Sequence, residues 1–240
     1  MGRRVSFLIA AVVFISFSAM GQPHEWVLSL VARGNFTTTS RIYPNPDALS
    51  TELRALNTPF NSILSAGAEV RAKWRDESFF FYFSSEYFSK SSIGPKLRGA
   101  ISGPILVDVE EGYRVIPLEL GMQVYVPIGS RSWRLSMGGG AGVYYAERIL
   151  REAGVRADPV GNRLGFGIHV SIQTEYNIFP GISAVAMMKF RDPEIDVNNK
   201  FAASATIVNG EVLPLPSGDI HSRVNVDGMT LGLGIIVVIL

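Results

Sequence analysis

The stretch FNSILSAGAEVRAKW, residues 60–74, alternates between apolar and polar side chains with almost no error. Its even positions include Leu64, Ala68 and Val70, whereas its odd positions include Glu69 and Arg71. A period of two is typical of a β-strand with one apolar and one polar face. Periodicity alone does not decide whether the apolar face meets a protein core or a lipid bilayer.

Seven further segments fit the same pattern, which predicts an all-β chain of eight antiparallel strands. The clearest is LGFGIHVSIQTEY, in which Ile168 and Val170 oppose His169 and Ser171. Helical periodicity is weak throughout the rest of the chain. The strands are expected at residues 26–36, 60–74, 78–88, 113–128, 133–145, 164–176, 182–191 and 228–240.

The first 21 residues have the features of a secretory signal peptide. Arg3 and Arg4 precede the apolar run FLIAAVVFISF, which is short for a membrane helix. Ala19 and Gly21 suit the small positions before a cleavage site, so Gln22 is the expected new N-terminus. We therefore expect a cleaved signal peptide, residues 1–21, followed by a single domain over residues 22–240.

Composition excludes several other classes of protein. The chain has no cysteine, which removes disulfides and thiolate nucleophiles. Its net charge of +1 gives no general electrostatic case for binding nucleic acid. From Gln22 onward no window approaches ~20 apolar residues, so a transmembrane helix is not expected in the mature chain.

The connections between the expected strands fall into two sorted groups. Links after the second, fourth and sixth strands are tight: RDE, GSRS and NIFPG. Links after the first, third, fifth and seventh are long and polar, at residues 37–59, 89–112, 146–163 and 192–226. Up-and-down strands place all short turns at one end, which is how outer-membrane barrels arrange turns and extracellular loops.

Two stretches within the long links look like hairpins of their own. PILVDVEEGYRV covers residues 104–115, and SATIVNGEVLPL covers residues 204–215 with an Asn-Gly turn. If both supplied spanning strands the barrel would have ten strands, but the sorting of the links would be lost. We therefore favour eight strands, with both hairpins standing on the outer loops.

Charged and aromatic side chains indicate which face meets lipid. Charges within the strand cores lie opposite the apolar set, and Arg114 and Asp227 lie on the apolar parity but at strand ends. Large rings lie near strand ends on the apolar side, as in the two aromatic girdles of a membrane barrel. The expected aromatic girdle is Trp26, Phe36, Phe60, Trp74, Phe79, Trp133, Tyr145, Tyr176 and Phe190. The expected lumenal polar network is Glu69, Arg71, Lys73, Glu86, Glu119, Gln123, Arg134, His169, Gln173, Glu175, Lys189 and Arg191.

With this pattern the chain resembles the small eight-stranded outer-membrane barrels of the OmpA, OmpX and OmpW type. The resemblance covers residues 26–240 and rests on the pattern of strands, turns and rings. It implies a transmembrane antiparallel up-and-down barrel in a Gram-negative outer membrane, inserted by the barrel assembly machinery and surrounded by outer-membrane lipid. A soluble lipocalin-type barrel is the alternative fold.

An eight-stranded barrel is only wide enough for side chains to fill it. Because unpaired buried charges are costly, we expect Glu69 and Glu119 to accept contacts from Arg71 and other lumenal bases. The main hypothesis is a structural plug. The alternative is a narrow channel made possible by inward glycines such as Gly138 and Gly140, which equally permit bends and close packing.

Catalytic and cofactor sites are not expected. His169, Ser171 and Glu175 share one face, but Glu175 lies roughly 20 Å along the strand from His169 at ~3.3 Å per residue. Three scattered histidines give no metal-ligand spacing. GGGAG at 138–142 lacks the Lys-Ser/Thr of a phosphate-binding loop, so no nucleotide cofactor is implied.

The long loops are the remaining candidates for recognition. Arg148, Arg151, Arg156 and Arg163 enrich the third link and suit lipopolysaccharide phosphates, although an ordinary solvated loop surface is the favoured explanation. We expect an integral outer-membrane protein with a structural or surface-interaction role and a largely plugged lumen. The alternatives are a narrow pore or carrier for small solutes and, third, a lipid-modifying enzyme.

Overall fold

The computed structural model describes residues 26–75, 77–130 and 132–240. This part of the chain is almost entirely antiparallel β-structure, with thirteen strands and one short helix. The elements are β1 (Trp26–Tyr43), α2 (Thr51–Ala55), β2 (Thr58–Trp74), β3 (Phe79–Ala100), β4 (Gly103–Gly129), β5 (Trp133–Glu152), β6 (Val155–Val160), β7 (Leu164–Phe179), β8 (Ile182–Arg191), β9 (Glu194–Phe201), β10 (Ala205–Val208), β11 (Glu211–Pro214), β12 (Ile220–Asn225) and β13 (Met229–Val238). The expected signal peptide, residues 1–21, lies outside the described residues.

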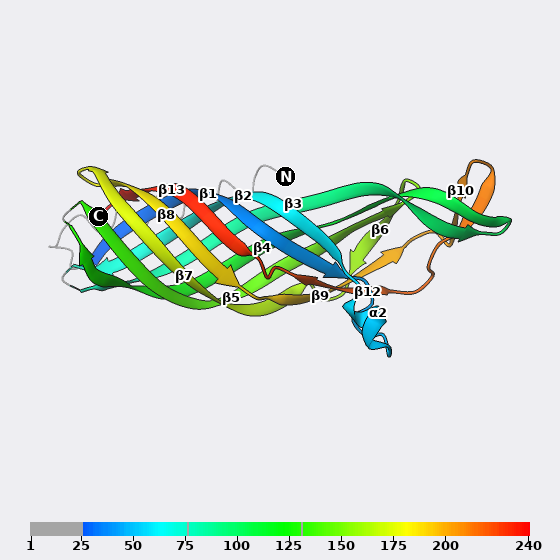
Figure 1. Cartoon of the computed structure of the whole chain (residues 1–240), viewed down its shortest axis with the longest axis horizontal. Coiled ribbons are helices and arrows are strands. Elements are labelled where there is room, and N and C mark those ends of the chain that lie inside the picture. Colours follow the sequence, from blue (N-terminus) through cyan, green and yellow to red (C-terminus); the bar gives the residue numbers. More distant parts are fainter. Residues whose placement is uncertain (1–25, 76, 131) are drawn as a thin grey trace.

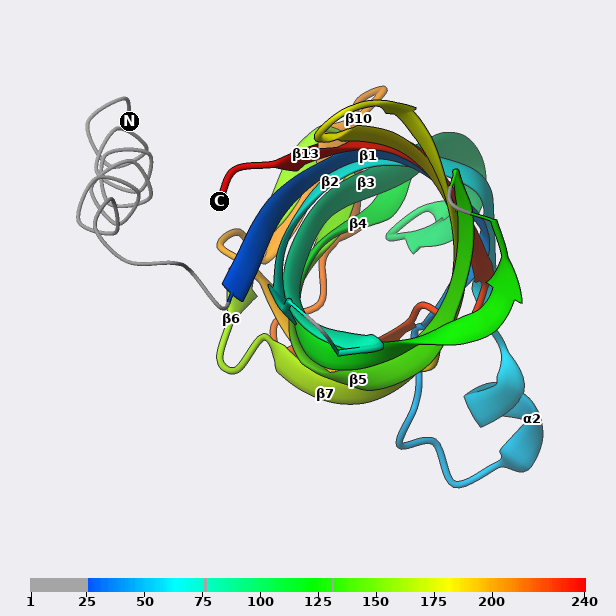
Figure 2. The ribbon, with the colours of Figure 1, turned by 90° about the vertical axis from the view of Figure 1, so that its left-hand side faces the viewer.

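Eight of these strands pair in a closed ring, seen end-on in Figure 2. The order is β1, β2, β3, β4, β5, β7, β8 and β13, and β13 pairs back onto β1. The strands are staggered. A path that starts at Val27 and steps from each residue to its register partner on the next strand does not return to Val27 but reaches β1 again at Thr37. Such a stagger belongs to tilted strands in a closed barrel.

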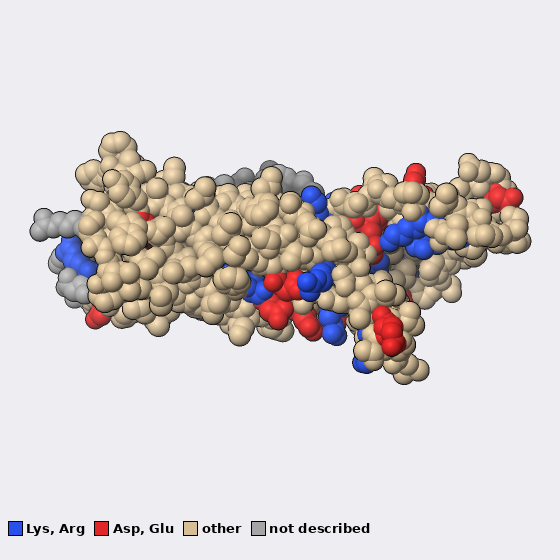
Figure 3. Space-filling view, viewed as in Figure 1, with Lys and Arg blue, Asp and Glu red and all other residues tan. Residues whose placement is uncertain are grey.

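The tight turns lie at one end of the ring, called here the turn end, at the left of Figure 1. The β10–β11 hairpin lies at the opposite, distal end. Along β2 the alternation separates inside from outside: Leu64 is 75% exposed, whereas Glu69 is 2% exposed. A band that shows almost no charge covers the outer wall between the turn end and the middle of the molecule (Figure 3).

The alternation of β2 breaks near its distal end. Ser62 has a φ of 57°, in the left-handed region that L side chains rarely adopt. As a result both Phe60 and Ile63 are buried, although they stand three positions apart. Phe60 was predicted in the aromatic girdle; that prediction is wrong, because the irregularity turns its ring into the interior.

The four long links do not form loops over most of their length, which is why thirteen strands are present instead of eight. The link 89–112 is the distal half of a hairpin made by β3 and β4, which turns only at Ile101 and Ser102. The link 37–59 contains the end of β1, then α2 and the start of β2. The link 146–163 contains the end of β5 and β6, and the link 192–226 contains four strands, β9 to β12.

These extra strands prolong the wall beyond the ring. β9 follows β8 after a break at Asp192 and Pro193, since proline removes a backbone donor from the ladder. β9 then pairs with β6 and β12, and β12 pairs with the distal end of β1. Past Ser65 and Phe88 no partners join β2 to β3 among the described residues, so the distal wall is a curled open sheet.

The two hairpins expected on the outer loops have different outcomes. β10 and β11 form a hairpin around Asn209 and Gly210, which have φ values of 53° and 86°, so this prediction is confirmed. The hairpin over residues 104–115 is wrong. Those residues run straight through β4, because β3 and β5 supply partners on both sides.

Candidate functional site in the barrel interior

Glu119 of β4 collects contacts from three sides of the interior. Its carboxylate lies 2.5 Å from Lys189 Nζ and 3.5 Å from Arg191 Nη1, both on β8. Tyr144 of β5 donates a hydrogen bond to Glu119 Oε1 at 2.8 Å. Arg191 also reaches Glu86 of β3, with 2.8 Å between Nη2 and Oε2. These contacts tie β3, β4, β5 and β8 together through their inward faces.

A second cluster lies nearer the turn end. Arg71 bridges Glu69, on its own strand, and Glu175 of β7. Arg33 of β1 lies 2.8 Å from the other oxygen of Glu69. Arg71 Nη2 also donates to Gln173 Oε1 at 2.5 Å. The cluster therefore joins β1, β2 and β7 across the lumen.

The buried charges inside the ring balance one another. Four cations face four anions: Arg33, Arg71, Lys189 and Arg191 against Glu69, Glu86, Glu119 and Glu175. Removing a charge from water is costly unless it is paired and hydrogen-bonded. Because the set is neutral overall and its members contact one another, it fills the lumen with a small desolvation penalty for ionic side chains.

The other members of the lumenal polar network also lie on the inner face. Gln123 accepts a hydrogen bond from Ser136 at 2.6 Å and donates one to Ser171 at 2.9 Å. Lys73 and Arg134 are half-buried near the turn end, where both lie over the ring of Tyr125. Arg134 further contacts Glu175 at 3.0 Å.

His169 is a member of the interior cluster. Its Nε2 lies 2.5 Å from the hydroxyl of Tyr82, and its Nδ1 lies 4.0 Å from Glu119. The hydroxyl of Ser171 is engaged with Gln123, and Glu175 is held by Arg71 and Arg134. The three residues weighed as a catalytic set thus have separate partners. Among the described residues, no group of three or more His, Asp or Glu side chains is placed to hold a metal ion.

An apolar layer closes the interior on the distal side of the charges. Phe60, Phe88 and Tyr113 pack edge to face, with ring centroids 5.5 and 6.2 Å from Tyr113. Side chains from all round the wall complete this apolar layer: Ile42, Ile63, Val115, Tyr144, Ala146, Ile195, Val197, Val224 and Val226. The alternation along the strands does not predict this layer. The sequence feature that points to it is that Ile63 and Tyr144 are large apolar side chains at positions where their strands otherwise carry polar or small residues.

Glycines on the inner face of β5 allow a close approach of strands. A Cβ added at Gly138 or Gly140 would lie 2.0 Å from a carbonyl oxygen of β4. On the facing strand, a Cβ at Gly121 would lie 2.5 Å from the hydroxyl of Tyr82. These positions therefore serve close packing and leave room for Tyr82.

Beyond the apolar layer lies a second polar layer centred on Glu111 of β4. Glu111 contacts Arg148 of β5, and its Oε2 lies 2.8 Å from Lys96 Nζ and 3.0 Å from the hydroxyl of Thr58. Burial raises the pKa of Glu111, but the charge of Arg148 and the contact with Lys96 outweigh it and bring the pKa below its ordinary value. Glu111 therefore stays ionised and links β2, β3 and β5, where β2 and β3 no longer pair.

On the outer wall, aromatic side chains lie toward the ends of the apolar band. Trp26 and Trp74 pack edge to face at the turn end, with 4.9 Å between ring centroids. Trp133 and Tyr176 are exposed on the neighbouring strands there, and Phe79 is half-buried. Toward the distal end Tyr145 and Phe190 are exposed and Phe36 is half-buried.

A charged collar follows the apolar band on its distal side. Arg114 stands opposite Glu147 across β4 and β5, and Glu147 pairs with Arg163 at 2.6 Å. Asp192 and Glu194 continue the collar on the β8–β9 side. Figure 3 shows charged side chains gathered at this height and beyond it, next to the uncharged band. The outer wall thus changes abruptly from apolar to ionic.

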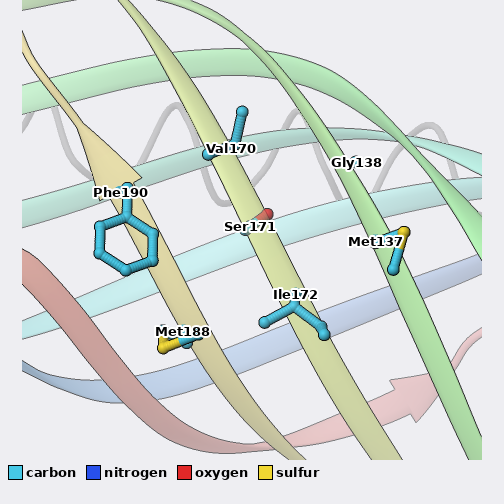
Figure 4. Close-up of a pocket in the computed structure, with 7 residues that line it drawn as sticks. All are labelled: Met137, Gly138, Val170, Ser171, Ile172, Met188 and Phe190. Carbon is cyan, nitrogen blue, oxygen red and sulfur yellow. The ribbon is translucent and has the colours of Figure 1, made fainter.

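The apolar band contains a shallow hollow of about 420 Å³ on β5, β7 and β8 (Figure 4). The outward side chains of Met137, Val170, Ile172, Met188 and Phe190 surround it, and the lumen-facing residues Gly138 and Ser171 line it between them. The walls are apolar apart from Ser171, so the hollow suits a hydrocarbon chain. Within the described residues no helix is long and apolar enough to cross a membrane.

Neither a protein-family model nor a curated protein matches the chain. Among solved structures, the chain is similar to the outer membrane protein OprG from Pseudomonas aeruginosa, with a TM-score of 0.57, 10% identity, and coverage of 90% of this chain and 97% of OprG. It is more distantly similar to Ail of Yersinia pestis, with a TM-score of 0.40, 12% identity, and coverage of 88% and 98%. It is likewise similar to the outer membrane protease OmpT of Escherichia coli, with a TM-score of 0.41, 8% identity, and coverage of 89% and 95%. The chain therefore has the fold of the small outer-membrane β-barrels.

Proposed function

We propose that this chain is an integral protein of a Gram-negative outer membrane, with an eight-stranded transmembrane ring, a plugged lumen and a surface-interaction role for its distal extension. One observation carries the proposal. The outer wall of the ring is a continuous apolar band, and the buried charges of the same strands face inward in balanced pairs. A soluble barrel has the opposite arrangement, with an apolar interior and a polar outer wall.

The fold is consistent with membrane insertion, since a closed ring leaves no backbone group unpaired at the depth of the hydrocarbon. Trp26, Trp74 and Trp133 at the turn end and the charged collar at the distal side bound the band where headgroups are expected. Residues 1–21 complete the proposal as a cleaved signal peptide, which delivers the chain across the inner membrane. Mass spectrometry of the mature protein tests this part: it should begin at Gln22.

Two layers support the plugged lumen. The ionic pairs around Glu119 and Glu69 cross the lumen inside the band, and the apolar layer around Tyr113 fills it just beyond. We therefore assign the protein a structural role within the wall of the ring.

The distal extension supports a surface-interaction role outside the cell. Its own core, around Val109, Leu150 and Phe201, holds the β3–β4 hairpin rigidly away from the membrane. The outward side of the extension exposes Leu97 and Leu106, which are register partners. Exposed apolar side chains on a rigid support are typical of a protein-binding surface. Lipopolysaccharide phosphates are the proposed neighbours of Arg151 and Arg163 nearer the membrane.

Site-directed probes test the membrane placement. The chain has no cysteine, so single cysteines at Ala68 and Ser84 can be labelled with a nitroxide without removing a native thiol. These residues lie on neighbouring strands, one on the outer face and one on the inner face. In vesicles, the label on Ala68→Cys should be reached by dissolved oxygen in the hydrocarbon, and the label on Ser84→Cys should not. Access of lipid-borne probes to Ser84 and of water to Ala68 would refute the proposal.

A further inference from the structure

The charged collar meets the apolar band directly on β4, β5 and β7. Toward the distal end, Ile116 is the last exposed apolar side chain of β4 before Arg114, which follows on the same face about 7 Å along the strand. The register partner of Ile116 on β5 is Tyr145, and Tyr145 in turn pairs with Leu164 at the start of β7. Tyr145 and Leu164 are 36% and 46% exposed. Charged and lipid-facing side chains are therefore neighbours on this part of the wall.

Arg163, the residue before β7, is held in one orientation beside these side chains. Its Nη1 donates to the hydroxyl of Tyr145 at 2.7 Å and to Glu147 Oε1 at 2.6 Å. Its Nη2 donates to the carbonyl oxygen of Pro159 at 3.2 Å, and its guanidinium lies 5.9 Å from the centroid of the Tyr145 ring. The side chain of Asn162 accepts a hydrogen bond from the backbone N–H of Arg163 at 2.8 Å. Because the guanidinium is already oriented, a ligand that binds it immobilises little.

Arg114 supplies a second guanidinium whose charge is not used within the protein. It stands opposite Glu147 in the register of β4 and β5, but the carboxylate of Glu147 is engaged by Arg163. Within the described part of the chain Arg114 has no ion-pair partner, and its side chain is exposed. Arg41, elsewhere on the outer wall, differs in being paired with Asp227 at 2.6 Å. The cluster of Arg114, Glu147 and Arg163 thus has two guanidinium groups, one carboxylate and a net positive charge.

The chemistry of the cluster fits a phosphate group. Guanidinium groups donate charge-assisted, often paired hydrogen bonds to phosphate oxygens. A phosphomonoester carries a charge of about −1.5 to −2 at pH 7, which two guanidinium groups can share. The apolar side chains next to the cluster show the source of the phosphate. Leu164 and the following outward residue Phe166, which is 75% exposed, suit acyl chains and offer nothing to a free phosphate ion.

We propose that Arg114 and Arg163 bind the phosphomonoester headgroup of an outer-leaflet lipid, whose acyl chains lie over Leu164 and Phe166. Tyr145 and Glu147 are positioning residues that hold Arg163. The proposal rests on the membrane placement proposed above and deepens it. It assigns one defined headgroup site to the border of the apolar band, where charge and exposed apolar side chains are contiguous.

Lipid binding to the full chain in detergent tests the site. Native mass spectrometry compares purified lipid A, which carries phosphomonoesters, with the same lipid after removal of its phosphates. Arg114→Gln should weaken binding of lipid A several-fold and leave binding of the dephosphorylated lipid unchanged. Added salt should weaken binding of lipid A more in the unmodified protein than in Arg114→Gln. Inorganic phosphate at the same concentration as the lipid should not displace it.

The variant and its control are chosen to leave the barrel intact. Arg114 has no ion-pair partner to lose, so Arg114→Gln should retain the heat-modifiability of the barrel on a gel. Arg156→Gln is the matched control. Arg156 is exposed, pairs with Asp158 only at 3.8 Å, and stands opposite Arg151, four positions beyond Glu147. Its replacement should leave the binding of lipid A unchanged.

A further variant tests the positioning role of Tyr145. Tyr145→Phe keeps the ring but removes the hydroxyl that accepts from Arg163 and donates to Glu147 at 2.9 Å. It should weaken binding of lipid A and not of the dephosphorylated lipid. An equal loss for both lipids would show that the hydroxyl serves only the structure of the wall.

The remaining outcomes separate the site from the membrane placement. Equal binding of lipid A to the unmodified protein and to Arg114→Gln overturns the site, and so does equal binding of the two lipids. A label on Ala68→Cys that reports hydrocarbon leaves the membrane placement standing in both cases. Displacement of lipid A by inorganic phosphate overturns the lipid assignment in favour of a free-phosphate site. A water-exposed label on Ala68→Cys overturns the membrane placement and this site with it.

Discussion

At the scale of single residues, Glu119 is held where no water can replace its partners. Changing Glu119→Gln leaves Lys189 and Arg191 buried with one fewer anion, and breaking a buried pair costs about 3–5 kcal/mol. We expect the free energy of unfolding to fall by that amount in denaturant titrations of the refolded protein in detergent. Glu194→Gln is the matched control, because its pair with Arg223 is largely exposed and should contribute under about 1 kcal/mol. Equal losses for the two variants would contradict the buried network.

Glu111 gives a prediction that depends on pH. Its pKa is below the ordinary value in the folded protein, so its ionised form contributes stability above pH ~4.5, and this contribution is lost as the pH falls through the folded pKa. The protection factors for hydrogen exchange in the distal half of the β3–β4 hairpin, which compare each exchange rate with the intrinsic rate at the same pH, should therefore fall in acid. In Glu111→Gln these protection factors should already be low at neutral pH and should lose most of their dependence on acid. Acid sensitivity that survives this substitution would assign the effect to another group.

At the scale of elements, the irregularity in β2 decides which rings face inward. Phe60→Ala should destabilise the protein by about 3–5 kcal/mol, since it opens a cavity in the apolar layer. Phe190→Ala, on the outer face, removes a ring that is 46% exposed and should cost much less. Chemical denaturation of both variants measures the difference. Similar small losses would return Phe60 to the lipid-facing girdle.

The same elements show what the sequence could predict. Alternation correctly placed Glu69 and Arg71 on one face of β2 and Leu64 on the other, because each face of this part of the strand has a single, uniform environment. It could not locate Phe60, since a single residue such as Ser62 at positive φ reverses every side chain beyond it. It also missed the strand over 89–100 and assigned residues 104–115 to a hairpin of their own: in the distal extension both faces of the β3–β4 hairpin tolerate polar residues, so SKSSIGPKLRGA carries no period.

The sequence also could not predict which charged side chains pair with one another inside the lumen. The inward parity identified Glu119, Lys189 and Arg191 as one set, but pairing depends on the stagger of the ring. One circuit of register partners round the ring shifts the position on β1 from Val27 to Thr37. This shift depends on the registers of all eight strand pairs together. A local pattern carries no information on such a closure condition.

At the scale of the whole molecule, the ionic pairs and the apolar layer block the lumen one after the other, and this predicts how the barrel behaves in a planar bilayer. An ion entering from the turn end must displace the paired charges around Glu69 and Glu119, and then pass the apolar layer around Tyr113, where the hydroxyls of Ser40 and Tyr113 are bonded to each other and too few polar groups remain to replace its water. Purified protein should therefore show no steady unit conductance at moderate voltage. Tyr113→Ala alone should not create conductance, because the ionic layer remains. A steady unit conductance from the unmodified protein would instead establish the narrow-pore alternative, and the buried pairs would then be a gate.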